Sequence, residues 1–93
     1  MRHFIIVKFK DGVDKRMLVQ PITELFKKVE MISGVEEVNV HLSNSDRSNR
    51  HDLMIEMELT PSGLIEYDKS ELHKQWKAEY GDYIASKTIF DCD

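Results

Sequence analysis

The sequence predicts an α+β fold whose elements follow the order β-α-β-β-α-β. Three observations lead to this order: apolar runs of strand length near both ends of the chain, one long stretch with apolar residues at three- and four-residue steps, and alternating segments between them. With 93 residues the chain suits one modest hydrophobic core, so we expect a single domain spanning residues 1–93. The order is that of the ferredoxin-like split βαβ arrangement, a four-stranded antiparallel sheet with helices on one face.

The first half of the chain is predicted to form a strand, a helix and a second strand. The run His3–Phe9 is apolar and rich in β-branched and aromatic residues. Asp14 is suited to cap a helix whose apolar spacing continues until residues 33–34, and Pro21 is expected to kink or split that helix. Apolar and polar residues then alternate from Val38 to Leu42, which is the period of a half-buried strand.

The second half is predicted to add a loop, a strand, a helix in two pieces and a last strand. Residues Ser43–Arg50 include no apolar side chain and are expected to form a solvated loop. Residues Leu53–Leu59 alternate as a strand, and Thr60-Pro61-Ser62 starts a short helix through Tyr67. A further helix is expected from about Glu71 to Ala85, followed by a strand over Lys87–Cys92.

Tyr67 and His73 lie six residues apart, on either side of a predicted helix break. In one continuous helix, at about 100° per residue, they would point roughly 120° apart. Ser70, however, is a good N-cap residue, and Glu71 carries a carboxylate suited to a first helical turn. His73 would then be the third residue of a new helix, where the dipole favours neutral imidazole, as a general base requires. The competing interpretation is that Tyr67 packs in the core and His73 is an ordinary surface histidine.

Composition argues against several partners. With 13 Lys+Arg against 17 Asp+Glu the formal charge is −4, so no basic surface for nucleic acid is expected. No apolar run approaches the roughly 20 residues of a membrane span, so no membrane partner is expected either. The single cysteine, Cys92, excludes an intrachain disulfide and fits a reducing compartment, and we therefore expect a cytoplasmic protein.

Neither a metal nor an organic cofactor is expected. The side chains that bind zinc most readily show no pair at zinc-like spacing: His3, His41, His51, His73 and Cys92.

One face of the predicted sheet is left uncovered by helices. We expect apolar and charged side chains to share this face: Phe4, Ile6, Met54 and Ile89 with Lys8, Glu56, Glu58 and Asp91. Because an exposed patch of this kind usually marks an interface, the sequence predicts a two-fold homodimer formed through the sheets.

Five segments together resemble the stress-responsive dimeric α/β-barrel (Dabb) domain family. They are HFIIVKFKDGV at the start, ISGVEEV after the first helix, HDLMIEMEL on the third strand, the segment Tyr67–His73, and TIFD near the end. The resemblance covers nearly the whole chain. It implies a homodimer whose two four-stranded sheets face each other as a barrel, with a cavity for a small organic ligand between the sheet and helices of each protomer.

The same resemblance suggests which residues line that cavity. A plant polyketide cyclase of the family closes a linear poly-β-ketone thioester by aldol condensation, and its catalytic tyrosine and histidine correspond to Tyr67 and His73. The resemblance thus implies His73 as the base and Tyr67 as a hydrogen-bond donor to the enolate oxygen. The ligand-binding residues expected on the same basis are His3, Ile5, Val7 and Leu25. Leu25 replaces a tyrosine of the cyclase, and Ser70-Glu71-Leu72-His73 replaces a frequent His-Pro-x-His, so a different substrate is expected.

Three function classes follow from the sequence. The favoured one is a small-molecule-binding domain, and the alternatives are a polyketide-cyclase-like enolising enzyme and a non-catalytic oligomeric stress protein. A haem-degrading monooxygenase with the same dimeric barrel is disfavoured, because the asparagine that those enzymes carry on the first strand is absent. A pocket that contacts both Tyr67 and His73 would favour the first two classes.

Overall fold

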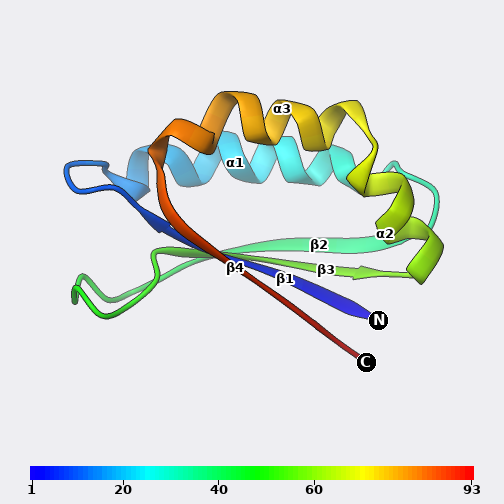
Figure 1. Cartoon of the computed structure of the whole chain (residues 1–93), viewed down its shortest axis with the longest axis horizontal. Coiled ribbons are helices and arrows are strands. Elements are labelled where there is room, and N and C mark those ends of the chain that lie inside the picture. The colour runs from blue at the N-terminus through cyan, green and yellow to red at the C-terminus, as the bar shows by residue number, and fades with distance from the viewer.

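The computed structural model describes all residues of the chain, Met1–Asp93. Its elements are β1 (Arg2–Phe9), α1 (Lys15–Val29), β2 (Val35–Leu42), β3 (Leu53–Leu59), α2 (Pro61–Asp68), α3 (Glu71–Tyr80), the 3₁₀ turn η1 (Gly81–Tyr83) and β4 (Ile84–Cys92). The strands form one antiparallel sheet in the order β2-β3-β1-β4, and α1 and α3 lie side by side over one of its faces (Figure 1). The predicted ferredoxin-like α+β fold is confirmed, with the second helix divided into α2 and α3.

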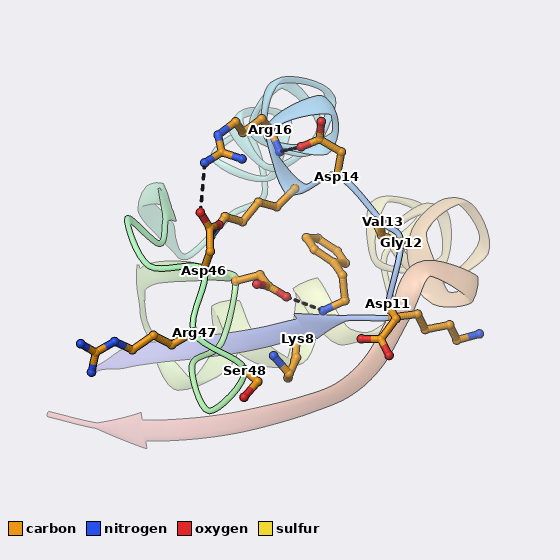
Figure 2. A pocket seen from close by; sticks show the side chains of 13 residues that line it. Lys8, Asp11, Gly12, Val13, Asp14, Arg16, Asp46, Arg47 and Ser48 are labelled. Atoms are coloured by element: carbon orange, nitrogen blue, oxygen red, sulfur yellow. Dashed lines mark hydrogen bonds and ion pairs between the residues drawn. The ribbon is translucent and has the colours of Figure 1, made fainter.

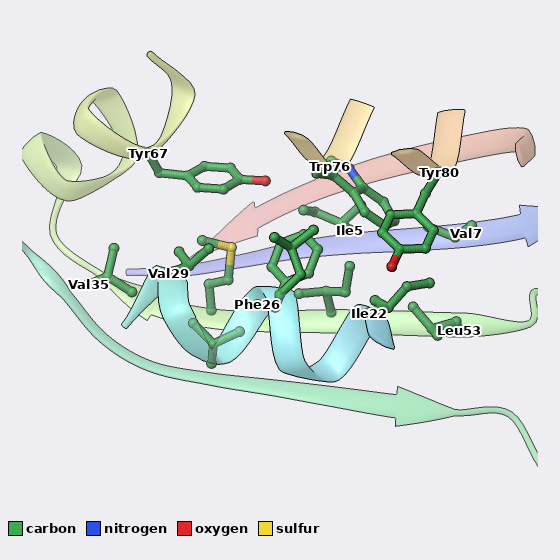
Figure 3. Packing of buried hydrophobic residues seen from close by; sticks show 14 of the residues in the cluster. Ile5, Val7, Ile22, Phe26, Val29, Val35, Leu53, Tyr67, Trp76 and Tyr80 are labelled. Carbon is green, nitrogen blue, oxygen red and sulfur yellow. The ribbon is translucent and has the colours of Figure 1, made fainter. Parts of the chain in front are cut away.

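The hydrophobic core lies between the sheet and the two long helices. Alternate side chains of β1 and β3 point into it, and α1 contributes Ile22, Phe26 and Val29 (Figure 3). The ring of Phe26 meets Trp76 of α3 edge-on, with ring centroids 5.0 Å apart. This aromatic pair joins the two helices over the middle of the sheet.

Helix α1 runs through Pro21 as one helix, so of the two predicted effects of this proline the split does not occur. The helix ends at Val29 rather than continuing to residues 33–34. Proline removes one backbone hydrogen bond from a helix. Here the helix is held by its buried apolar side, so the loss does not divide it. The predicted cap is confirmed, because the Asp14 carboxylate accepts the Arg16 N–H at 3.0 Å.

The predicted boundary between α3 and β4 is wrong. The helix ends at Tyr80 instead of Ala85, and the strand begins at Ile84 instead of Lys87. Strand β1 accounts for the difference, because Ile84 pairs with the end of β1 and the Lys10 N–H donates to the Tyr83 carbonyl at 2.8 Å. Pairing with β1 thus sets the boundary between helix and strand where the local sequence does not.

The register between β1 and β4 corrects the predicted composition of the open sheet face. His3 lies opposite Asp91, Ile5 opposite Ile89, and Phe4 opposite Phe90. Paired residues share a face, so Ile89 and Asp91 lie on the helix side with Ile5, and Phe90 takes the open side beside Phe4. A slip of one residue exchanges the faces of a whole strand.

Two glycines fix the position of α2. Gly34, at φ +91°, and Gly63 meet backbone to backbone, and a Cβ added to Gly63 would lie 2.4 Å from the Gly34 carbonyl oxygen. The Thr60 N–H also donates to that carbonyl at 2.8 Å. These contacts hold α2 against the turn before β2, and Tyr67 lies one helical turn beyond Gly63.

Candidate functional site

A pocket of about 370 Å³ lies between β1, β4 and the two pieces of the second helix. Four of the residues expected at a site line it: His3, Ile5, Tyr67 and His73. The other two do not, because Val7 and Leu25 are buried in the hydrophobic core away from the pocket. The structure thus gathers the two candidate catalytic residues and the strand-side histidine around one space.

Tyr67 presents a buried polar group at this pocket. The residue is 1% exposed, and its hydroxyl has no hydrogen-bond partner within the protein. Figure 3 shows the ring extending from α2, with the hydroxyl directed along β1 rather than back to the helix. Burial, together with the nearby Asp68 carboxylate, raises the pKa of Tyr67 far above its usual value. The side chain is therefore a neutral hydrogen-bond donor that lacks an acceptor.

His73 is held beside Tyr67 by the predicted helix break. Ser70 caps α3 as expected, because its Oγ accepts the His73 N–H at 3.2 Å. The His73 ring nitrogen Nδ1 lies 2.8 Å from the Asp68 carbonyl oxygen. A carbonyl only accepts, so Nδ1 carries a proton and the neutral ring has its lone pair on Nε2. The ring centroids of His73 and Tyr67 are 4.8 Å apart, so the break brings the two side chains together.

His3 brings a second histidine ring near Tyr67, from strand β1 rather than from the helices. It is buried, its ring centroid is 6.4 Å from that of Tyr67, and its Nδ1 lies 2.5 Å from an Asp91 carboxylate oxygen. The carboxylate accepts from Nδ1–H and fixes the orientation of the ring. From the sequence, Asp91 was predicted to lie on the open sheet face. The register between β1 and β4, which local patterns do not reveal, places it at the pocket instead.

Other pocket residues were also missed. Lys87 and Ile89 come from β4, and Trp76 and Lys77 come from α3. The α3 residues follow His73 at helical spacing, so an i, i+3 and i+4 projection from His73 would have indicated them.

A second cavity, of about 310 Å³, lies at the opposite end of the sheet between the start of α1 and the loop after β2 (Figure 2). Lys15 is buried there, and its Nζ donates to the Ser45 carbonyl at 2.7 Å and contacts Asp46 at 3.3 Å. Arg16 also contacts Asp46, at 3.5 Å. These ion pairs hold the loop against α1. The charges of Lys15, Arg16 and Asp46 are therefore largely paired within the protein.

Neither a metal cluster nor a membrane span is found. No three side chains of His, Cys, Asp or Glu come together where they could hold a metal ion. No helix combines the length and the apolar character needed to cross a bilayer.

Fold and pocket together define a ferredoxin-like α+β protein with a histidine- and tyrosine-lined space beneath a split second helix. No protein-family model matches the chain. No curated protein matches it in sequence either.

Solved structures show where the same fold occurs. A dimeric ferredoxin-like protein of unknown function from Bacteroides fragilis matches with TM-score 0.83 and 16% identity over 99% of this chain and 93% of that chain. A Dabb family protein from Mesorhizobium loti matches with TM-score 0.72 and 12% identity over 99% and 93%. A hydroxynitrile lyase from Passiflora edulis matches with TM-score 0.73 and 12% identity over 96% and 87%. At these identities the likeness concerns the fold.

Proposed function

We propose that residues 1–93 form a Dabb-type domain that binds a small organic molecule in the pocket between β1, β4 and α2–α3. The unpartnered hydroxyl of Tyr67 carries this proposal. Burying a hydroxyl without a partner costs about 1–3 kcal/mol, and a ligand oxygen that accepts its hydrogen bond would remove that penalty. The apolar side chains of Ile5 and Trp76 and the two histidines supply the rest of a mixed lining suited to an organic molecule.

Fragment screening by ¹⁵N–¹H NMR tests the binding proposal. Ligands should shift the backbone amide signals of β1, α2 and α3 around the pocket. Tyr67→Phe should lower the affinity for these ligands about tenfold, because it removes the hydrogen-bond donor. Tyr83→Phe is the matched control, because Tyr83 is 43% exposed and lies outside this pocket. If no fragment of a chemically broad library perturbs these amides, the third class, a non-catalytic oligomeric protein, becomes the better account.

A second candidate function is enolising catalysis, favoured by the relation between His73 and Tyr67. With Nδ1–H held by the Asp68 carbonyl, the Nε2 lone pair of His73 is free to remove a proton from a carbon acidified by two carbonyl groups. The C–H electron pair moves to a carbonyl oxygen as an enolate, which accepts a hydrogen bond from Tyr67. The enolate carbon can then form a C–C bond to a second carbonyl carbon, whose oxygen takes up the proton from the histidine.

Proton exchange tests this chemistry without the natural substrate. We expect the protein to accelerate deuterium incorporation at the carbon between the carbonyls of an acetoacetyl thioester. His73→Gln should abolish the acceleration, Tyr67→Phe should reduce it about 10²-fold or more, and His51→Gln should leave it unchanged, because His51 is exposed and outside the pocket. A wild-type exchange rate equal to that of buffer would reject catalysis and leave binding intact.

We also propose that the protein is a two-fold dimer formed through the open sheet face. Phe4 and Phe90 are cross-strand partners on that face with ring centroids 6.2 Å apart, and Ile6 lies beside them. Phe90 is 57% exposed, which is unusual for so large an apolar side chain on a monomer. The fold neighbour from Bacteroides fragilis is described as dimeric, which supports the same assembly here.

A further inference from the structure

The pocket has two lysines on opposite sides that the proposed function does not use. Lys77 projects from α3 and Lys87 from β4, and both line the space that contains Tyr67 and His73. Both residues are exposed, so they lie where the pocket opens to solvent. The inner end of the pocket therefore presents the neutral hydrogen-bond donor of Tyr67, and its outer end carries two ammonium groups.

These two lysines differ from their neighbours in having no carboxylate partner. Lys69, at the end of α2, contacts Glu66 at 3.1 Å. Lys74, near the start of α3, contacts Glu71 at 3.2 Å. Lys77 and Lys87 form no ion pair in the structure. Their charges are thus available to a ligand.

The two carboxylates that line the pocket do not pair with the two lysines. Asp91 accepts a hydrogen bond from His3, and neither Asp91 nor Asp68 forms an ion pair with Lys77 or Lys87. Both ammonium groups are therefore free to contact a ligand. Bringing a carboxylate or phosphate between two ammonium groups forms charge-assisted hydrogen bonds, which are stronger than neutral ones.

We propose that the pocket selects organic anions, binding a carboxylate or phosphate group between Lys77 and Lys87 while Tyr67 donates to a carbonyl or hydroxyl oxygen deeper inside. The inference rests on the proposed function, because it requires that a ligand occupies this pocket. It adds the chemical class of that ligand: a compact body with an oxygen acceptor at one end and a negative charge at the other.

Three related probes test the inference: para-acetylbenzoate, its neutral methyl ester, and para-acetylphenyl phosphate. Each carries the same aryl ketone as an acceptor for Tyr67, and the three differ in the group that would meet the lysines. In NMR titrations, we expect at least one of the two anions to bind about tenfold or more tightly than the ester. Its affinity should fall as salt is added, because exposed charges are screened. Comparison of the two anions shows whether carboxylate or phosphate is preferred.

Charge-removing variants assign the effect to the two lysines. Lys77→Met and Lys87→Met should each lower the affinity for the preferred anion several-fold and leave the affinity for the ester unchanged. Methionine keeps most of the side-chain length without the charge. Lys74→Met is the matched control, because Lys74 lies on the same helix, pairs with Glu71 and does not line the pocket. All three positions are exposed, so each variant should fold, and the spectra themselves verify this.

Different failures separate the two proposals. If ester and anions bind equally and both lysine variants bind like the wild type, while Tyr67→Phe weakens every probe, anion selection is wrong and binding in the pocket stands. If none of the probes shifts the pocket signals at millimolar concentration, the anion proposal is overturned. Binding of other fragments in the broader screen then decides the proposed function separately.

Discussion

Gly63 of α2 packs directly on the backbone of Gly34, so closely that neither position has room for a side chain. A Cβ on Gly63 would lie 2.4 Å from the Gly34 oxygen, and one on Gly34 would lie 2.7 Å from the Gly63 Cα. This contact sets the distance between α2 and the sheet. Because Tyr67 extends from the same helix into the pocket, the site depends on two residues that never touch a ligand.

Gly63→Ala should therefore destabilise the protein by about 1–3 kcal/mol, the range for overpacking a close contact. Chemical denaturation followed by circular dichroism measures the effect. Gly81→Ala is the control, because an added Cβ there meets no atom within 4 Å and the backbone is already helical at φ −55°. Equal stabilities of the two variants would show that α2 can move away from Gly34 without loss.

Tyr67→Phe should leave the ligand-free protein as stable as the wild type or stabilise it by up to about 1–3 kcal/mol, because it removes a buried hydroxyl without a partner. The same change should weaken ligand binding. Thermal and chemical unfolding without ligand provide the measurement. A clear loss of stability would mean that the hydroxyl already has a hydrogen-bond partner in the ligand-free protein.

Alkaline pH should reveal the same burial. The pKa of Tyr67 is raised in the folded state, so its neutral form stabilises the fold fully below the unfolded pKa of about 10, and this contribution is lost as pH rises through the folded value. The free energy of unfolding should decline above about pH 10, and less steeply in Tyr67→Phe. Burial also raises the pKa of Tyr80, so the difference between wild type and variant isolates Tyr67. Parallel declines would contradict the assignment.

Acid pH tests a different contact, between Glu30 and the middle of β2. The Glu30 carboxylate accepts the Val38 N–H at 2.9 Å and contacts Lys27 at 3.3 Å, and these interactions lower the pKa of Glu30. The contribution of Glu30 to the free energy of unfolding is fully present above its ordinary pKa of 4.5 and is lost as pH falls through its lowered pKa in the folded state. Glu30→Gln should be less stable than the wild type at neutral pH, and the gap should close in acid. Glu36→Gln, at an exposed position with no such contacts, should show no gap at either pH.

The proposed dimer predicts light scattering at about twice the chain mass of 10.9 kDa. Ile6→Asp should shift the protein toward monomer, because it would place an unpaired charge at the buried seam. Ile65→Asp serves as the control, since Ile65 is 61% exposed and belongs to α2 rather than to the open sheet face. A well-folded wild-type monomer at micromolar concentration would rule out the barrel dimer.

The sequence by itself determined the order of the elements, because this information is local. An apolar run rich in β-branched residues marked β1, alternation marked β2 and β3, and three- and four-residue spacing marked α1. The oxygen-bearing side chains of Asp14 and Ser70 capped the helices that follow them. The helix break, predicted at residues 68–70 and found at residues 69–70, was predictable for the same reason. It already implied that Tyr67 and His73 need not lie on opposite sides of one helix.

Tertiary structure alone decided the register of β4 and what depends on it. Ile89 and Phe90 are both apolar, so alternation could not tell which of them faces the helices; pairing with β1 settles it and brings Asp91 to His3. The helical continuity at Pro21, the contact of Gly34 with Gly63, and the separation of Val7 and Leu25 from the pocket likewise arise from packing between segments distant in sequence. Local patterns specify elements because their hydrogen bonds and caps are formed within a few residues. A pocket is formed by side chains from several elements, so its composition follows from how those elements meet.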